Sequence, residues 1–482
     1  METPPINVLP SVHATARDEQ NLAGNLESLV AVGAFLFEHD KEGWIWNTIA
    51  NKYKMAEPAS IKTTYIQVLS LLAKERITYE LLWAIFPPNS NVYTKCLVTG
   101  APQCVRYDSC EEREAPLGAE SYNIICHYLD SDAGKAWLDI TIPKFSGTKS
   151  ICTLEAFPLL YHPDAEALTT YFVQCGRTFV SIHRPHHCFY PGPMFYMNQG
   201  ALVEKHITSC VVLDSCGRAL GQIEDSDDID PTELEEKDLC ICSPTVSGFA
   251  LEDELWGQFL VANIEEIQWS SSPFGCLRIP AEDQETITTL ARTYGTGEGS
   301  GLNITLHGTP GIAKPLIATA VSEYLQTPLI SFDAGRLRLD PETWRTQLSN
   351  LFRMAKRWNA IILLGQAEIA LDSRQARNLV SDFLRQVRVY NGIIFLEVGR
   401  QCSPDVDVQS KIALSVRYNK QYTDGNNRTL GDYYQISSFK LESVPGLRES
   451  SRSSYQNILI VLAIAIRLWV AQIIAAGGID LD

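Results

Sequence analysis

The segment Gly308-Thr309-Pro310-Gly311-Ile312-Ala313-Lys314-Pro315 decides how this chain is interpreted. It follows the phosphate-binding pattern G-x-x-x-x-G-K-[ST], in which backbone N–H groups and the lysine hold phosphates and the hydroxyl ligates Mg²⁺. Gly308 and Lys314 stand at the required spacing. Ala313 replaces the second glycine, and Pro315 replaces the Ser or Thr with a residue that suits a helix start but has no hydroxyl. The segment therefore predicts a phosphate loop that lacks one metal ligand.

The residues on both sides of this loop alternate between apolar strands and helices. The predicted strands are residues 302–307, 328–332, 360–364 and 392–396, and the predicted helices are residues 316–325, 343–358 and 378–389. Strands that are apolar throughout and alternate with helices form parallel sheets covered on both faces. We therefore expect an α/β core over residues 291–425, with any ligand bound at the carboxyl ends of its strands.

The remaining chain predicts further domains around this core. A length of 482 residues is typical of two or three domains. Short β-like runs at 92–98 and 122–128 are separated by turn residues, which indicates a mixed α+β, β-rich domain. The expected order is a variable helical leader at 1–75, the β-rich amino-terminal domain at 76–222, an acidic linker and connecting segment at 223–290, the core at 291–425 and a tail at 426–482.

Composition limits the class of partner and the compartment. The formal charge of −17 argues against nucleic-acid binding through bulk electrostatics. The first 20 residues lack the basic and apolar regions of a secretory signal. Thirteen cysteines form an odd set without a regular framework, which favours reduced thiols. We therefore expect an intracellular, most simply cytoplasmic, protein.

The carboxyl-terminal segment 458–479 is apolar and long enough to span a bilayer. Arg467 near its centre costs about 2.5–3.5 kcal/mol on insertion scales, which the surrounding aliphatic residues are able to offset. One interpretation is a tail anchor in a membrane. The other, which we favour, is a terminal helix buried against the last domain.

Histidines and cysteines gather in two places without the spacing of a metal site. One group is His183-Arg-Pro-His-His-Cys188, and the other is the pair Cys240 and Cys242. A zinc site usually shows two well-spaced ligand pairs, whereas the histidines form a compact loop and the Cys-x-Cys pattern favours a strand. We expect no metal site here.

Several blocks along the chain carry a resemblance to a known family. In the amino-terminal part they are Leu82-Trp-Ala-Ile-Phe86, Phe145-Ser-Gly-Thr-Lys149, Pro158-Leu-Leu-Tyr-His-Pro163 and Gly176-Arg-Thr-Phe179. Further along they are Leu239-Cys-Ile-Cys-Ser-Pro-Thr-Val-Ser-Gly-Phe249, Trp256-Gly-Gln-Phe259, Arg377-Asn-Leu-Val-Ser-Asp-Phe-Leu-Arg385 and Tyr390-Asn-Gly-Ile-Ile-Phe-Leu396. Together they resemble a fungal family of AAA+ ATPases with an amino-terminal domain of unknown function, over residues 76–420. The resemblance implies an AAA+ P-loop core and ATP hydrolysis with Mg²⁺.

The chain departs from this family at the positions that carry the chemistry. Gly365 and Gln366 stand where active members have the aspartate that holds Mg²⁺ and the glutamate that polarises water. Gly399 replaces the sensor asparagine, and Lys411 replaces the arginine finger that acts in trans. Glu368 matches another acidic position of the family, but its place two residues beyond Gln366 leads us to expect that it points away from the reaction centre.

These departures predict a pseudo-ATPase. Loss of an arginine finger alone costs about 10³–10⁵ in rate, and lysine lacks the planar fork that spreads charge over the phosphoryl group. Gly308, Gly311 and Lys314 still offer N–H groups and positive potential, so ATP binding remains open while the missing ligands argue against Mg²⁺. The resemblance implies an assembly component in homo- or hetero-oligomers with AAA+ relatives.

Two other interpretations stay open. One is a working AAA+ ATPase that uses Gln366, Glu368 and Lys411 in substitute roles. The other is a relic without a selected activity. The sequence names no client or pathway for any of the three.

Overall fold

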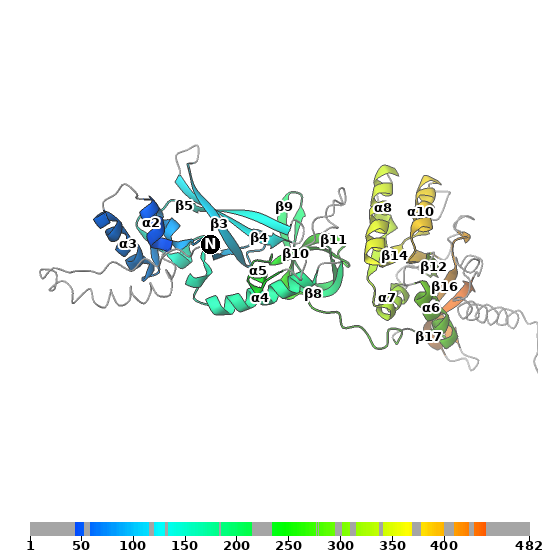
Figure 1. Cartoon of the computed structure of the whole chain (residues 1–482). Coiled ribbons are helices and arrows are strands. Elements are labelled where there is room, and N and C mark those ends of the chain that lie inside the picture. Colours follow the sequence, from blue (N-terminus) through cyan, green and yellow to red (C-terminus); the bar gives the residue numbers. More distant parts are fainter. Residues whose placement is uncertain are drawn as a thin grey trace, which may run out of the picture. The chain divides into compact units, whose positions relative to one another are not determined.

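The computed structural model places the chain in two compact units, one formed by Met1–Ser181 with Ser226–Pro244 and the other by Ile182–Asp225 with Thr245–Asp482. Figure 1 labels their elements along the chain. The structure describes residues 44–52, 58–114, 120–130, 134–182, 185–214, 234–275, 277, 279–294, 301–308, 315–336, 341–368, 377–399, 409–423 and 429–439.

The first unit is built on a five-stranded antiparallel sheet in the order β5-β4-β3-β2-β7. Its strands are β2 (Asn91–Lys95), β3 (Pro102–Glu114), β4 (Glu120–Asp130), β5 (Gly134–Pro143) and β7 (Phe157–Pro158). The short strands β1 (Arg76–Thr78) and β6 (Thr148–Ser150) pair beside it. The helices of this unit are α2 (Trp44–Lys52), α3 (Pro58–Leu72), α4 (Ala165–Ser181) and α5 (Glu236–Leu239), with 3₁₀ turns η1 (Tyr79–Ile85), η2 (Ile151–Thr153) and η3 (Leu159–Tyr161).

One apolar core joins this sheet to the helices before it. Ile49 of α2 and Leu69 of α3 are buried with Leu82 of η1 and with Ile124 on β4. Burying a side chain of this size stabilises a fold by about 1.5–3 kcal/mol. The predicted helical leader and β-like runs are thus parts of one packed unit, as far as residues 44–52 and 58–72 show.

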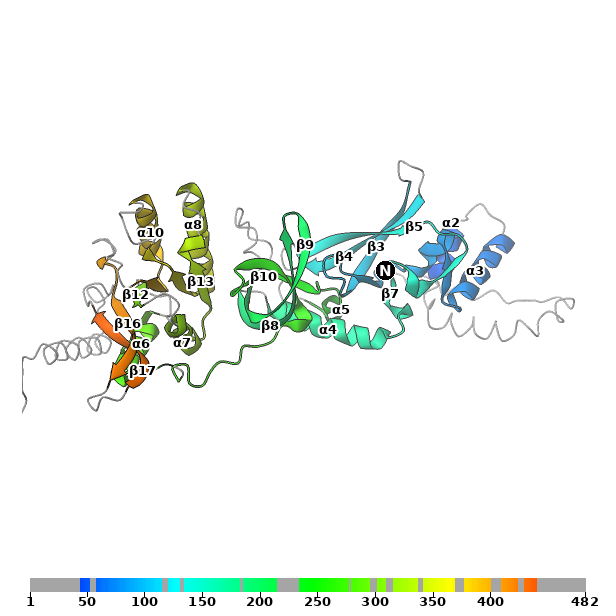
Figure 2. The same cartoon turned by 180° about the vertical axis from the view of Figure 1, so that it is seen from behind.

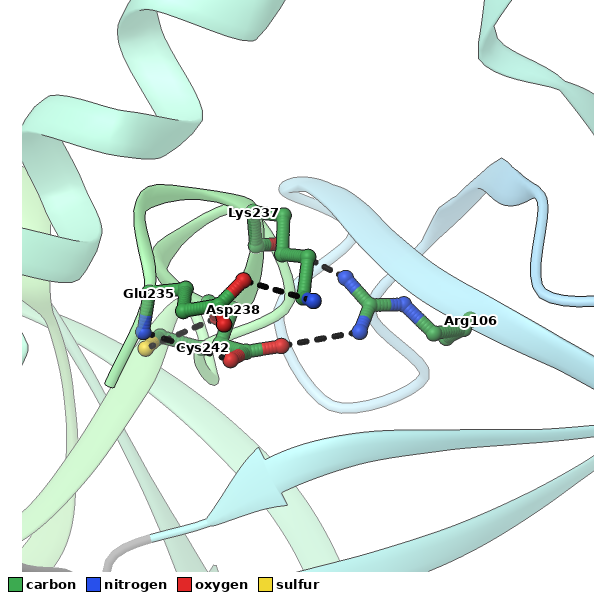
Figure 3. A network of polar contacts seen from close by, with 5 residues as sticks. All are labelled: Arg106, Glu235, Lys237, Asp238 and Cys242. Carbon is green, nitrogen blue, oxygen red and sulfur yellow. Dashed lines mark hydrogen bonds and ion pairs between the residues drawn. The ribbon is translucent and has the colours of Figure 1, made fainter. Parts of the chain in front are cut away.

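The segment 234–244 returns to the first unit and is fixed there by Arg106 of β3 (Figure 3). Arg106 Nη1 lies 2.8 Å from Asp238 Oδ1, and its Nη2 donates to the carbonyl of Lys237 at 2.7 Å. A side chain at position 176 on α4 would collide with the backbone of Leu239, so glycine is required there. Two blocks that lie far apart in the sequence therefore meet in space.

Cys240 and Cys242 lie in a turn and an isolated bridge, so the expected strand is wrong.

The second unit begins with a small closed barrel in the order β10-β11-β8-β9. Its strands are β8 (His186–Asn198), β9 (Ala201–Leu213), β10 (Thr245–Ala250) and β11 (Leu255–Leu260), followed by the 3₁₀ turn η4 (Val261–Asn263). β9 and β10 pair directly although the predicted boundary at residue 222 lies between them.

The rest of the second unit is a six-stranded sheet in the order β13-β14-β15-β12-β16-β17. Its strands are β12 (Leu302–His307), β13 (Leu329–Asp333), β14 (Ile361–Gly365), β15 (Ile393–Val398), β16 (Leu414–Thr423) and β17 (Thr429–Phe439). The first five are parallel, and β17 is antiparallel to β16. The helices are α6 (Ala281–Tyr294), α7 (Pro315–Leu325), α8 (Pro341–Trp358) and α10 (Arg377–Val389), with the turn η5 (Ala334–Arg336).

Helices cover both faces of this sheet (Figures 1 and 2). Ile362 and Ile394 pack with Trp344 of α8 and Phe383 of α10 on one face. On the opposite face, alternate strand residues pack with α6 and α7; they include Ile304, Leu363 and Phe395. The expected α/β architecture with a parallel sheet is confirmed, because both parities of β14 and β15 are apolar and each finds helices on its own side.

The two interpretations of the carboxyl-terminal segment concern residues that the structure does not describe. The apolar segment 458–479 and its flanks lie outside the described residues. Within the described ranges, no helix combines the length and the apolar character that crossing a bilayer requires.

Within the second unit, the barrel is joined to the helical layer through Asp214, at the end of β9. Its side chain is only 2% exposed, and Oδ2 accepts hydrogen bonds from Arg357 Nε and Trp358 Nε1, both at 2.7 Å. The Trp358 ring also lies 5.7 Å from the ring of Phe249 on β10. A buried carboxylate is stable only with such partners, so this junction depends on both donors.

We predict that Asp214→Ala destabilises the second unit by about 2–3 kcal/mol, because the Trp358 N–H is left buried without an acceptor. Asp214→Asn keeps one acceptor oxygen and should lose less. Denaturant unfolding followed by intrinsic tryptophan fluorescence measures both. Asp253→Ala, which removes a surface partner of Lys205, serves as a control and should change stability little. Equal stability of Asp214→Ala and the unaltered chain would contradict the prediction.

His187 on β8 gives the second unit a dependence on pH. Burial, followed by the charge of His186, lowers the pKa of His187 to about 4, and both ring nitrogens are buried without a hydrogen-bond partner in the described structure. The unfolded chain therefore takes up a proton near pH 6.5 while the folded chain does not, so stability falls as pH falls from about 6.5 towards 4.

Between pH 7 and pH 5 this difference amounts to about 2 kcal/mol. We predict that His187→Phe removes that part of the pH dependence of the unfolding free energy, measured by urea unfolding at both pH values. The exposed His206→Gln on β9 should retain it. An unchanged slope in His187→Phe would show that the histidine is not the titrating group.

Candidate functional site

The carboxyl ends of three neighbouring parallel strands meet at one edge of the second unit. The Gly308 N–H, just after β12, donates to the carbonyl of Val398 on β15 at 3.4 Å. The Ala367 N–H, just after β14, donates to the carbonyl of Glu397 at 2.9 Å. These bonds bring together the ends at Gly308, Gly365 and Gly399, as the sequence predicted for a ligand site of a parallel sheet.

The side chains at this edge that face α7 are acidic. Asp333 is paired with Gly365 across β13 and β14, and Glu397 is paired with Leu306 across β15 and β12. Residues 361 and 363 on β14, and 393 and 395 on β15, pack against α6 and α7. Because side chains alternate along a strand, positions 365 and 397 also face that side. This is the face from which the helix after the phosphate loop begins.

Two glutamates lie beside Gly365 and Gly399 at the ends of the strands. A Cβ added to Gly365 would lie 3.9 Å from Glu397 Oε2, and one added to Gly399 would lie 3.7 Å from Glu368 Oε1. Glu368 Oε2 is buried and has no hydrogen-bond partner among the described residues. Glu368 therefore lies against Gly399, one of the positions that the sequence singled out. Each glutamate therefore lies on or just after the strand next to that of the glycine it approaches.

Gln366 is held away from a water-orienting role by its own contacts. Its backbone is left-handed, with φ of 49°, and its side-chain Nε2 donates to Asp333 Oδ2 at 2.9 Å. The other oxygen of Asp333 accepts the Gly335 N–H at 2.8 Å. The Gln366 side chain therefore stabilises the turn after β13.

The phosphate loop itself is described only at its two ends. Thr309, Pro310, Gly311, Ile312, Ala313 and Lys314 lie outside the described residues. Gly308 is buried after β12, and Pro315 is exposed as the first residue of α7. A strand, the loop sequence and a helix therefore follow in the order the pattern requires.

Lys411 lies near the amino-terminal end of β12, at the opposite end of the strands. Its carbonyl accepts Asn303 Nδ2 at 3.1 Å, and Asn303 is near the start of β12, whereas Gly308 follows its end. Gly308 lies five positions after Asn303, which corresponds to about 16 Å along an extended strand. Lys411 is therefore not part of the strand-end site of its own chain.

The residues present do not complete a set for Mg²⁺. Pro315 brings no hydroxyl and Gly365 no carboxylate, which leaves Glu397 as a substitute at that position. No group of three metal-ligating side chains is found in the parts of the chain that are described. A helix N-terminus such as that of α7 favours a nearby anion.

The first unit has a cavity of about 930 Å³ beside the segment held by Arg106. Leu159, Leu160 and the first turn of α4 line it together with Arg106 and Lys237. Both cations are already paired, Arg106 with Asp238 and Lys237 with Glu235 at 2.6 Å. The lining therefore combines apolar surface with cations that are paired with acids. Its described residues include no nucleophile beside a base.

Sequence reasoning missed Glu397. A signal was present, because it is the one charged residue in the apolar strand β15. Its distance to Gly365 depends on the register of two strands that are not adjacent in sequence, which no motif encodes.

A family described as a domain of unknown function (DUF7025) matches residues 67–163. The expected amino-terminal domain of unknown function is thereby confirmed for that range, which lies in the first unit. None of the curated proteins matches the chain.

Among solved structures, two of the FIGL-1 AAA domain are similar to part of the chain. The complex with ADP is 14% identical, with 32% of this chain and 56% of that chain covered and a TM-score of 0.27. The second is 15% identical, with 29% and 52% covered and a TM-score of 0.25. The chain spans about half the length of these structures, and the scores are too low for the likeness to carry further weight.

Proposed function

We propose that the chain is an AAA+-like pseudo-ATPase that acts as an assembly or interaction component, with nucleotide binding that is weak or absent. The proposal rests on which side chains lie at the carboxyl ends of the strands. Two reaction positions, Gly365 and Gly399, have no side chain, and glutamates from other strands lie beside them. The parallel sheet and its helices, by contrast, are fully packed.

The charge at this edge supports the loss of turnover. Asp333, Glu368 and Glu397 place three carboxylates near the strand ends, where a triphosphate would bring further negative charge. Two like charges about 4 Å apart repel by about 4 kcal/mol at an effective dielectric constant of 20. In active enzymes Mg²⁺ offsets such repulsion. Without a full ligand set for the ion, bound ATP is disfavoured.

The position of Lys411 is compatible with a role towards a neighbouring subunit. It is exposed at the edge of the sheet opposite the strand ends, so it acts in trans if it acts on nucleotide at all. An oligomer with AAA+ relatives, to which this chain contributes structure rather than hydrolysis, follows from the proposal.

A second candidate is a working ATPase in which Glu397 replaces the missing metal-binding aspartate. The 3.9 Å distance between Glu397 Oε2 and the Cβ position of Gly365 favours it. Mg²⁺ in phosphate sites often uses only one or two carboxylates, with the remaining ligands from water and phosphate. The two candidates differ in what Glu397 does.

Glu397→Gln separates them because the candidates predict opposite results. For the pseudo-ATPase, the full chain shows no phosphate release above the Lys314→Ala background, and Glu397→Gln binds ADP about tenfold more tightly because one repulsive charge is gone. Phosphate release and ADP-dependent thermal stabilisation measure the two quantities. Glu342→Gln, an exposed charge change on α8, is the control.

If the second candidate holds, the unaltered chain hydrolyses ATP and Glu397→Gln lowers the rate by at least about a hundredfold. Turnover that Lys314→Ala abolishes would refute the pseudo-ATPase.

The proposal also predicts that chemistry is recoverable. A Cβ at Gly365 meets its neighbours at 3.7–3.9 Å, which is ordinary contact, so an aspartate fits there. We expect the combination Pro315→Thr, Gly365→Asp, Gln366→Glu and Glu397→Gln to release phosphate from ATP with Mg²⁺, while the unaltered chain does not. The same combination with Lys314→Ala is the control. Absence of turnover in the fourfold variant would show that the loop at residues 308–315 no longer holds the phosphates for reaction.

A further inference from the structure

The first unit contains a groove between two parts of its own sheet. Among the strands that the structure describes, β5 is an edge strand and pairs with β4 alone. At the other end of the sheet, β7 pairs with β2 only at Val92 and Tyr93, so Thr94 and Lys95 extend beyond it. A cavity of about 540 Å³ is lined by both β5 and this part of β2, which means that the sheet bends until the two approach one groove.

The groove is open to the backbone edge of β5. It is lined by Leu138, Asp139, Ile140 and Thr141, four consecutive residues. Alternate residues of a strand point to opposite faces, so a cavity that touches all four lies along the edge of the strand. Half of the N–H and C=O groups of an edge strand point away from its neighbour, and these are available for another strand.

The size of the groove fits one extended segment. A strand rises about 3.3 Å per residue and occupies about 4.8 Å by 10 Å in cross-section, so four residues need about 600 Å³. The cavity has about 540 Å³. The opposite wall is formed by Thr94 with the segment around Glu155, where Thr94 Oγ1 donates to the Glu155 carbonyl at 3.2 Å. An inserted strand would lie between β5 and that wall.

The lining gives the occupant its chemistry. Tyr93, Leu97, Leu138 and Phe157 supply apolar surface, and Leu97 is 83% exposed. The exposed charged residues of the lining are Asp139, Glu155 and Lys95, which carry one net negative charge, and Asp139 Oδ2 also lies 3.7 Å from Arg113 Nη2 on β3. The chain as a whole carries −17, which steers basic segments towards it.

We propose that this groove binds an extended peptide segment of a partner protein, about four residues long, in which aliphatic and basic residues alternate. The peptide adds a strand to β5 through backbone hydrogen bonds, its aliphatic side chains contact the apolar lining, and its basic side chains approach Asp139 and Glu155. This site lies within the first unit and does not depend on the nucleotide site.

The test uses the full chain and a fluorescein-labelled probe, acetyl-Lys-Val-Lys-Val-Lys-amide, with binding followed by fluorescence anisotropy. A probe with N-methylated valines keeps every side chain but loses two N–H donors, and it should bind at least about tenfold more weakly. A probe with glutamate in place of lysine should not bind. In hydrogen exchange, residues 138–141 should gain protection when the first probe is added.

Two surface variants locate the site on the protein. Leu97→Ser and Asp139→Lys should each weaken the first probe several-fold, while Leu202→Ser, at an exposed apolar position of the barrel hairpin, should leave binding unchanged. Circular dichroism melts establish that each variant is folded.

Several results would overturn the proposal. Equal affinity for the N-methylated probe would show that no strand is added. Protection confined to residues outside 138–141, or no binding of the probe at millimolar concentration, would exclude the groove. Concentration-dependent self-association that protects 138–141 without peptide would assign the edge to a second copy of the chain instead.

Discussion

The parallel sheet of the second unit must bury both of its faces, and most of what the chain retains follows from that constraint. Strands β14 and β15 have apolar residues at successive positions, so one set packs on α6 and α7 and the other on α8 and α10, whereas β12 adds apolar residues only on the α6 and α7 side. A shift of one residue would exchange the two sets and leave neither helix layer a matching surface. The register is therefore fixed, and with it the positions of Gly308, Gly365 and Gly399 at one edge.

This constraint explains why the elements of the core could be predicted. The strand expected at 302–307 is β12 with the same limits, and the helix expected at 343–358 ends at Trp358 as observed. Long apolar runs specify such elements locally. The sequence pattern did not predict the barrel strands, because β9 mixes charged residues such as Glu204 and Lys205 with apolar ones. Its closure depends on residues 245–260, which lie beyond a long acidic segment.

The site was predictable in place but not in content. Strand order and the phosphate-loop pattern put the candidate positions at the carboxyl edge. What surrounds them depends on contacts across strands, as between Glu397 and Gly365 or between Glu368 and Gly399. The hydrogen bond between Gln366 and Asp333 likewise depends on the left-handed backbone at Gln366, which no local sequence pattern predicts. The groove beside β5 was missed for the same reason, since it arises from the bending of a whole sheet.

Under the proposed function, the residues that hold the fold and the residues that would carry the chemistry are different ones. The buried strand residues each contribute on the order of 1.5–3 kcal/mol, so their replacement would threaten folding. Gln366 and Pro315 are exposed and Gly365 is half-buried at the sheet edge, so substitutions there have little effect on packing. A chain released from the need to hydrolyse ATP would therefore lose acids and hydroxyls at the edge long before it lost apolar residues beneath them. Glu397 and Glu368 lie at the same edge, and both residues are only partly buried there, so their charges remain in partial contact with water.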